Sequence, residues 1–94
     1  MTLQTRPFDP ADYLDSTEAI AAYLEGAFAD GDSTEIADAL GVVARAHGMT
    51  AVAEETGLSR QALYKALSKD GNPSLSTLLK VTRALGVRLS FQPT

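Results

Sequence analysis

The stretch from Thr50 to Ser68 constrains the fold of this chain most, because it has the pattern of two short helices joined by a tight turn. Gly57 stands at the turn, where a backbone with positive φ favours glycine. Ala53 is small enough for the second helix to cross closely over the first, and the apolar Leu58 can anchor the turn in a core. The pattern predicts a helix-turn-helix over residues 50–68.

The second helix of this motif is expected to have two chemically different faces. Its predicted inner face is apolar and consists of Ala62, Leu63, Ala66 and Leu67, opposite Val52 of the first helix. Its outer face is polar, and the major groove of DNA accepts such a helix and displays a distinct pattern of donors and acceptors for each base pair. The candidate DNA-binding residues are Thr50, Ser59, Arg60, Gln61, Tyr64, Lys65 and Lys69.

The side chains of these candidates favour different contacts. Arg60 is suited to a bidentate contact with guanine and Gln61 to one with adenine, and each such pair discriminates by about 1–3 kcal/mol. Tyr64 is suited to a phosphate or to the methyl group of thymine. Lys65 and Lys69 are better placed for phosphates, which add affinity without reading sequence.

Thr50 stands at the start of the first motif helix, where its hydroxyl and the helix N-terminus can bind a phosphate. For every candidate the alternative is an exposed polar side chain on a helical bundle.

Apolar residues recur at helical spacing in three further segments, each with a capping residue before it and a glycine after it. Ser16 precedes the first and Gly31 follows it, Asp32 and Gly48 bound the second, and Ser74 and Gly86 bound the last. The apolar stripe predicted for the last helix is Leu75, Leu78, Leu79, Val81, Thr82 and Leu85. The chain is therefore expected to be all-α, with about five helices.

The two ends of the chain do not follow the helical pattern. Residues 1–15 contain Pro7 and Pro10 and are expected to form an irregular arm ahead of a domain over residues 16–94. Residues 87–92 alternate apolar and polar side chains, which predicts a short C-terminal β-strand. A strand needs a partner, and the choices are the arm near residues 3–8, a second copy, or an edge strand of another protein. The alternative is a frayed tail.

The net charge of −4 conceals two halves of opposite sign. Residues 1–44 hold nine acids and one base, for a charge of −8, whereas residues 45–94 hold seven bases and three acids, for +4. Such asymmetry indicates two surfaces with different partners. The basic half is suited to phosphates, and the acidic half either faces a basic protein or is simply solvated.

Several function classes are disfavoured by what the chain lacks. It has no cysteine and one histidine, His47, whose expected place in the last turn of a helix favours a structural role. We therefore expect neither an enzyme nor a metal site or cofactor. No basic-then-apolar leader opens the chain and no apolar run is long enough to span a bilayer, so we expect a cytoplasmic protein.

Over about residues 9–90, the sequence resembles the lambda-repressor-like (Cro/C1-type) helix-turn-helix family. Within it, the chain is most similar to the addiction module antidote proteins, the HigA-like antitoxins. The matching segments are AAYLE at 21–25, DGD at 30–32, ALG at 39–41, ARAHGMT at 44–50, GLSR at 57–60, LYKALS at 63–68, GNPS at 71–74 and ALGV at 84–87.

The resemblance implies an antitoxin of a type II toxin-antitoxin module. Such proteins neutralise a toxin, typically a small basic RelE/ParE-like ribonuclease, and repress their own operon by binding its double-stranded operator DNA. The expected C-terminal strand stands where the family has a fifth helix, so a homodimer would be joined by strands rather than by helices. The alternative is a protein-interaction module, or a transcriptional regulator without a toxin partner.

Overall fold

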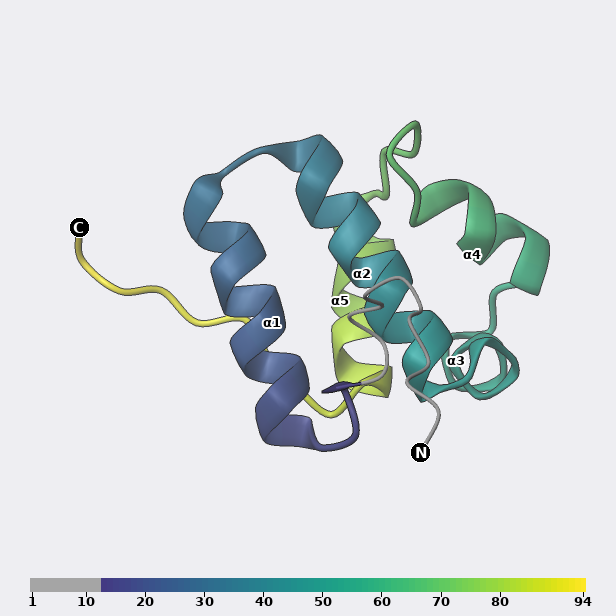
Figure 1. Ribbon diagram of the computed structural model, residues 1–94. Coiled ribbons are helices and arrows are strands. Elements are labelled where there is room, and N and C mark those ends of the chain that lie inside the picture. The colour runs from purple at the N-terminus through teal and green to yellow at the C-terminus, as the bar shows by residue number, and fades with distance from the viewer. Residues whose placement is uncertain (1–12) are drawn as a thin grey trace, which may run out of the picture.

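The computed structural model describes residues 13–94, which form five helices and no strand (Figure 1). Short turns or loops join the helices. The prediction of about five helices is therefore confirmed for this part of the chain. The helices are α1 (Thr17–Asp30), α2 (Ser33–His47), α3 (Met49–Thr56), α4 (Arg60–Ala66) and α5 (Leu75–Ala84).

Four helices begin at the capping residue that the sequence predicts. The Ser16 Oγ accepts a hydrogen bond from the backbone N–H of Ala19 at 3.1 Å. Asp32, Ser59 and Ser74 cap α2, α4 and α5 in the same way. Each cap satisfies a backbone donor that the first helical turn leaves unpaired. Helix α3 differs, because it begins one residue before the predicted start and has no side-chain cap.

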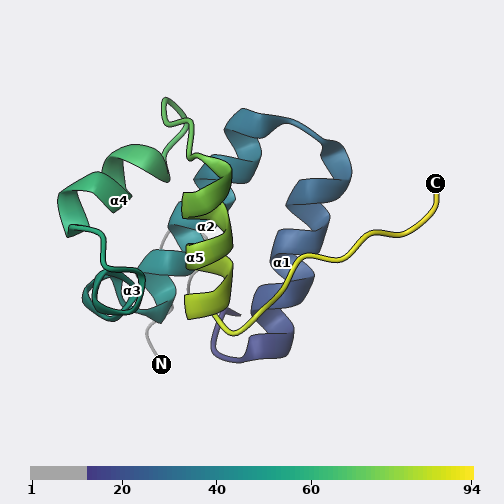
Figure 2. The ribbon, with the colours of Figure 1, turned by 180° about the vertical axis from the view of Figure 1, so that it is seen from behind.

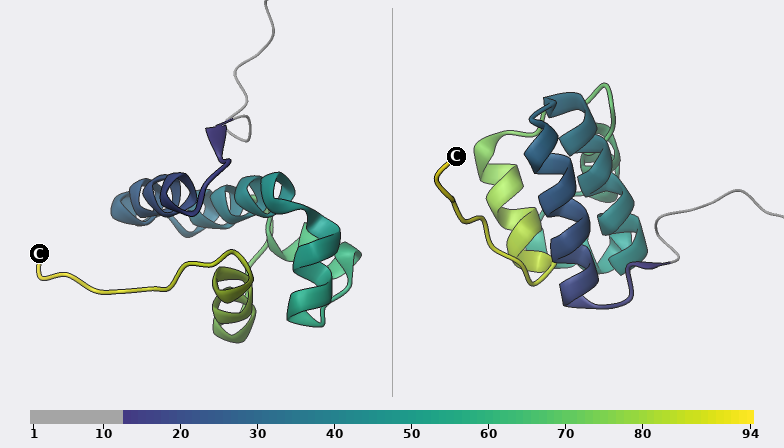
Figure 3. Two further views of the ribbon diagram at one scale, coloured as in Figure 1. Left: turned by 90° about the horizontal axis from the view of Figure 1, so that it is seen from below. Right: turned by 60° about the vertical axis from the view of Figure 1, so that its left-hand side comes forward.

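Helix α2 packs against three other helices, α1, α3 and α4. Helices α1 and α2 lie side by side, and α3 and α5 lie on one side of that pair (Figure 3). Helix α5 packs against α3, and the view from behind shows it in front of α2 (Figure 2). Helix α1 is at one end of the molecule and α4 is at the other (Figure 1).

The core is formed where α2 meets α1, α3 and α4, and where α3 meets α5. Its fully buried large side chains are Leu40, Leu63, Leu67, Val43, Val52 and Val81. Ile20 and Leu24 extend it under α1, and Leu14 of the predicted arm is also buried in it. The remainder of the arm, residues 1–12, lies outside the described residues.

One glycine sets the distance between α2 and the end of α4. A Cβ atom added to Gly41 would lie 2.1 Å from the backbone carbonyl oxygen of Leu67, far inside van der Waals contact. Gly41 is itself buried in the middle of α2. The absence of a side chain at this position lets the backbone of α4 approach α2 directly.

The predicted C-terminal strand is wrong. Residues 87–94 have no regular secondary structure, and the segment leaves α5 and runs past α1 (Figures 1 and 2). No strand exists within residues 13–94 to pair with it, and a lone strand would leave its backbone groups unsatisfied. Phe91 is 96% exposed, so its side chain finds no core to enter. The suggested partner near residues 3–8 lies outside the described residues.

Three residues predicted for apolar inner faces are exposed. Ala62 of α4 lies on the outer side of its helix, whereas Leu63 and Leu67 are buried. On α5, Leu75 is 68% exposed and Leu79 is 47% exposed. The buried stripe of α5 is narrower than predicted, because the helix packs mainly against α3 and no described element covers its flank.

Candidate nucleic-acid interface

The α3–α4 unit, residues 49–66, is built around a three-residue turn. Gly57 ends α3 with φ 75°, in the left-handed region that glycine occupies without steric cost. Its N–H donates to the carbonyl of Ala53, and Ser59 then caps α4. Figure 1 shows α3 end-on and α4 from the side, so the two helix axes cross. The turn and the cap stand where the sequence predicted them.

Thr56 fixes this turn and was not among the predicted residues. It is buried, and its hydroxyl donates to the carbonyl of Val52 at 2.7 Å. The same oxygen accepts a hydrogen bond from the N–H of Leu58 at 3.3 Å. One side chain thus ties the end of α3 to the residue that enters the core after the turn. A hydroxyl residue directly before the turn glycine was the available signal.

All seven predicted DNA-binding residues are exposed, and five of them are on α4 or its cap. Gln61 and Lys65 are one turn apart on the side of α4 opposite the buried Leu63 and Leu67. Lys69 lies in the loop after α4, and the Ser59 oxygen is engaged in the cap. The structure therefore brings five candidates together on one helix and places Lys69 close behind it in the chain.

Thr50 is exposed in the first turn of α3, but Glu54 lies one helical turn along the same side. A phosphate at Thr50 would therefore face a carboxylate. This makes Thr50 the weakest of the seven candidates on electrostatic grounds.

Arg60 and Tyr64 are in contact. The Arg60 Cζ atom lies over the Tyr64 ring, 5.9 Å from its centroid, and both side chains are exposed. Residues four apart in a helix share a flank, so both groups lie beside Gln61 and Lys65 on the polar surface of α4. The Arg60 guanidinium therefore lies near the Tyr64 ring at the start of α4.

The charges of α4 differ from those of the N-terminal helices. Helices α1 and α2 each have an acid in the first turn, Glu18 and Glu35, where it is stabilised by the helix dipole. Helix α4 has no acid in its first turn and begins with Arg60. Helices α1 and α4 lie at opposite ends of the molecule (Figure 1), but residues 87–94 of the basic half run past α1, and the acids Glu54 and Glu55 are exposed on α3 beside α4.

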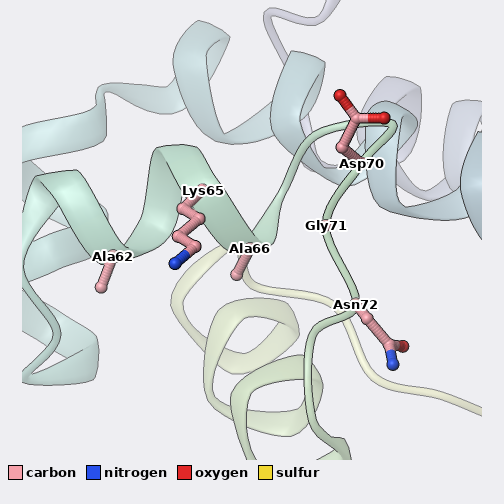
Figure 4. Close-up of a pocket in the computed structure, with 6 residues that line it drawn as sticks. All are labelled: Ala62, Lys65, Ala66, Asp70, Gly71 and Asn72. Atoms are coloured by element: carbon pink, nitrogen blue, oxygen red, sulfur yellow. The ribbon is translucent and has the colours of Figure 1, made fainter.

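A shallow hollow lies beside α4, on the flank away from Tyr64. Its volume is about 290 Å³, and its walls are one side of α4 and the loop that follows (Figure 4). The loop can fold back because Gly71 has no side chain, since a Cβ there would lie 2.1 Å from the carbonyl oxygen of Ala66. The lining residues are Ala62, Lys65, Ala66, Asp70, Gly71 and Asn72.

No helix within residues 13–94 has the length and apolar character needed to cross a bilayer. The same residues contain no cluster of three or more histidine and carboxylate side chains placed to bind a metal ion.

Comparison with known proteins identifies the family. The family of probable addiction module antidote proteins matches residues 4–93. An uncharacterized protein of Haemophilus influenzae is 42% identical over 92 residues, which are 98% of this chain and 95% of that relative. No solved structure matches the chain. Since the match extends over nearly all of its length, the chain belongs to the family of probable addiction module antidote proteins.

Proposed function

We propose that this protein is a DNA-binding antitoxin that represses its own operon. In this proposal the α3–α4 unit is a helix-turn-helix of the lambda-repressor-like type, and α4 enters the major groove of the operator. The observation that supports it most is the arrangement of α4, with polar Arg60, Gln61 and Lys65 exposed opposite the buried Leu63 and Leu67. Such a helix can offer donors to base edges without disturbing the core.

The antitoxin part of the proposal is supported by family membership. We propose a HigA-like antitoxin whose partner is a small basic toxin of the RelE/ParE-like kind. The acidic end formed by α1 and the start of α2 complements a basic partner in charge. DNA and toxin would then occupy opposite ends of the molecule.

We further propose that the operator is bound by a homodimer, because helix-turn-helix dimers match two half-sites one helical turn apart. The exposed Leu75 and Leu79 leave apolar surface on α5 that a second copy can cover. The protein would act in the cytoplasm as a binding protein rather than an enzyme, without a cofactor.

Selection from a library of randomised DNA duplexes tests DNA binding. The wild-type protein is expected to enrich a two-fold symmetric motif. In Arg60→Ala, the preference for guanine at one position of each half-site is expected to fall by about 1–3 kcal/mol. Circular dichroism should show an unchanged fold, since Arg60 is exposed. Enrichment of no sequence by the wild-type protein at low salt would contradict the proposal.

The second candidate function is a protein-interaction module in which the α3–α4 unit only packs the domain. The net charge of −4 favours it, because DNA repels an acidic protein. A gel shift with the DNA upstream of the gene distinguishes the two candidates, because only a DNA-binding antitoxin is expected to bind that DNA. Rescue of growth when the product of the adjacent reading frame is co-expressed tests the antitoxin role separately.

A further inference from the structure

We propose that Tyr64 is a positioning residue for guanine recognition, because its ring holds the Arg60 guanidinium along the flank of α4. This inference rests on the proposed function, and it assigns Tyr64 a role through Arg60 instead of a contact of its own with DNA. It begins with the 5.9 Å contact between the Arg60 Cζ atom and the centre of the Tyr64 ring.

The helix geometry brings these two groups together. Side chains in an α-helix tilt toward its N-terminus, so the residue at i+4 leans back over the residue at i. Tyr64 therefore leans toward Arg60, and the guanidinium carbon lies over the ring. The distance of 5.9 Å to the ring centroid is within the range of a cation–π interaction, near its outer limit.

The position of Arg60 makes such support useful. Arg60 is the first residue of α4, where the positive end of the helix dipole disfavours a cation. Its side chain is exposed, so no packing fixes its rotamers, and ordering a free arginine costs conformational entropy. A ring one turn away attracts the cation and narrows the rotamers available to it.

The guanidinium remains able to bind a base in this arrangement. A ring attracts the cation through its face, whereas the N–H donors of the guanidinium lie in its own plane and form a fork. That fork matches the O6 and N7 acceptors of guanine in the major groove. Restricting Arg60 before binding reduces the entropy lost when the contact forms.

The prediction concerns discrimination at one base. Replacing Tyr64 by leucine keeps an apolar side chain of similar reach but removes the ring. The preference for guanine at the position read by Arg60 is expected to fall about two- to five-fold, the equivalent of an exposed cation–π contact of about 0.5–1 kcal/mol. Tyr64→Phe retains the ring and is expected to retain the wild-type preference.

The test uses randomised duplexes to find the preferred motif and then a matched pair of duplexes that differ only at that guanine. Affinities for the pair are measured for wild type, Tyr64→Leu, Tyr64→Phe, Arg60→Ala and the double variant Arg60→Ala/Tyr64→Leu. The double variant is expected to discriminate no worse than Arg60→Ala alone, because Tyr64 acts through Arg60. Proton chemical shifts of the Arg60 side chain in free protein should lose their ring-current contribution in Tyr64→Leu only.

The outcomes separate the inference from the proposed function. If the wild-type protein enriches no sequence, the proposed function fails, whatever the shifts in the free protein show. If Arg60→Ala loses the preference for guanine but Tyr64→Leu keeps it, the positioning role is overturned. Equal losses in Tyr64→Phe and Tyr64→Leu would also overturn it, because they would assign the effect to a hydroxyl contact with DNA.

Discussion

At the scale of single residues, the α3–α4 turn depends on one hydroxyl group. Thr56 donates to the Val52 carbonyl and accepts from the Leu58 N–H, and it is buried while doing so. A buried backbone donor that loses its partner raises the free energy of the folded state. The orientation of α4 relative to α3 therefore depends on a buried side chain that does not belong to the exposed surface of α4.

Thr56→Val is expected to lower the free energy of unfolding by about 1–2 kcal/mol, because valine keeps the shape but leaves the Leu58 N–H without its acceptor. Urea denaturation measures this change. Thr56→Ser is the matched control, since it keeps the hydroxyl and loses one methyl group. A valine variant as stable as wild type, or less affected than the serine variant, would show that the hydrogen bonds contribute nothing.

At the scale of elements, the position of α4 is fixed by the close approach of its end to α2. The backbone carbonyl of Leu67 occupies the space that a side chain at position 41 would need. Gly26 of α1 provides a contrast, because nothing lies within 4 Å of the position its Cβ would take. The two glycines are both inside helices but are present for different reasons.

Gly41→Ala is expected to lower the free energy of unfolding by about 1–3 kcal/mol, because α4 must move to relieve the overlap. Gly26→Ala is expected to raise it by about 0.5–1 kcal/mol, since alanine favours the helix and meets no neighbour. Thermal or urea unfolding of the two variants measures whether the free energy of unfolding falls or rises in each. Stabilisation by both substitutions would contradict the close approach of α2 and α4.

The helices and their ends could be predicted from the sequence because their causes are local. Ser16, Asp32, Ser59 and Ser74 cap the helices they precede, and Gly57 forms the predicted turn. These features depend on neighbours within four residues along the chain.

The errors concern contacts between distant segments. The periodicity of α5 places Leu75 and Leu79 in its apolar stripe. How much of that stripe is buried depends on the helices that pack against α5, and both residues are exposed. The prediction of a C-terminal strand was wrong for a related reason. Alternating apolar and polar side chains predict a strand but do not supply the second strand with which it must pair. Gly41 was missed because its close approach to Leu67 joins segments far apart in the sequence. Thr56 is a different case, because its hydrogen-bond partners lie within four residues and the hydroxyl before the turn glycine was an available signal.

The candidate DNA-binding residues come from one short motif, and their contact with DNA stays a prediction. All seven are exposed, five of them on α4 or its cap, and the α3 face is electrostatically less favourable because Glu54 neighbours Thr50. The contact of Arg60 with Tyr64 follows from their spacing of four, although spacing alone does not distinguish a ring contact from two independent side chains.

At the scale of the whole molecule, acids dominate the N-terminal helices, whereas α4 carries only basic charges. The described residues before position 45 include seven acids, all on α1, α2 or the segments next to them, whereas Arg60, Lys65 and Lys69 surround α4. The exposed surface of α4 therefore carries cations although the molecule as a whole is acidic, and in the proposed function this surface faces DNA. Its affinity should depend on the local charges and on the salt concentration.

The double variant Lys65→Gln/Lys69→Gln is expected to reduce the slope of log K against log salt by about two, because each phosphate contact contributes about one. Sequence preference should be unchanged, since phosphate contacts carry no sequence information. Fluorescence anisotropy with the selected duplex over a range of salt concentrations measures the slope. Lys80→Gln on α5 is the matched control and should leave the slope unchanged, and an equal effect there would argue against a specific role for α4.

The acids concentrated on α1 and α2, together with the cations of α4, give the molecule an uneven distribution of charge. In the field of a DNA duplex, such a molecule would experience a torque as well as a net repulsion, and the torque would turn the acidic end away from the phosphates. A randomly oriented protein would have to collide many times before α4 met the groove. This protein would arrive already rotated, so the acidic end that lowers its attraction to DNA would also help to aim it.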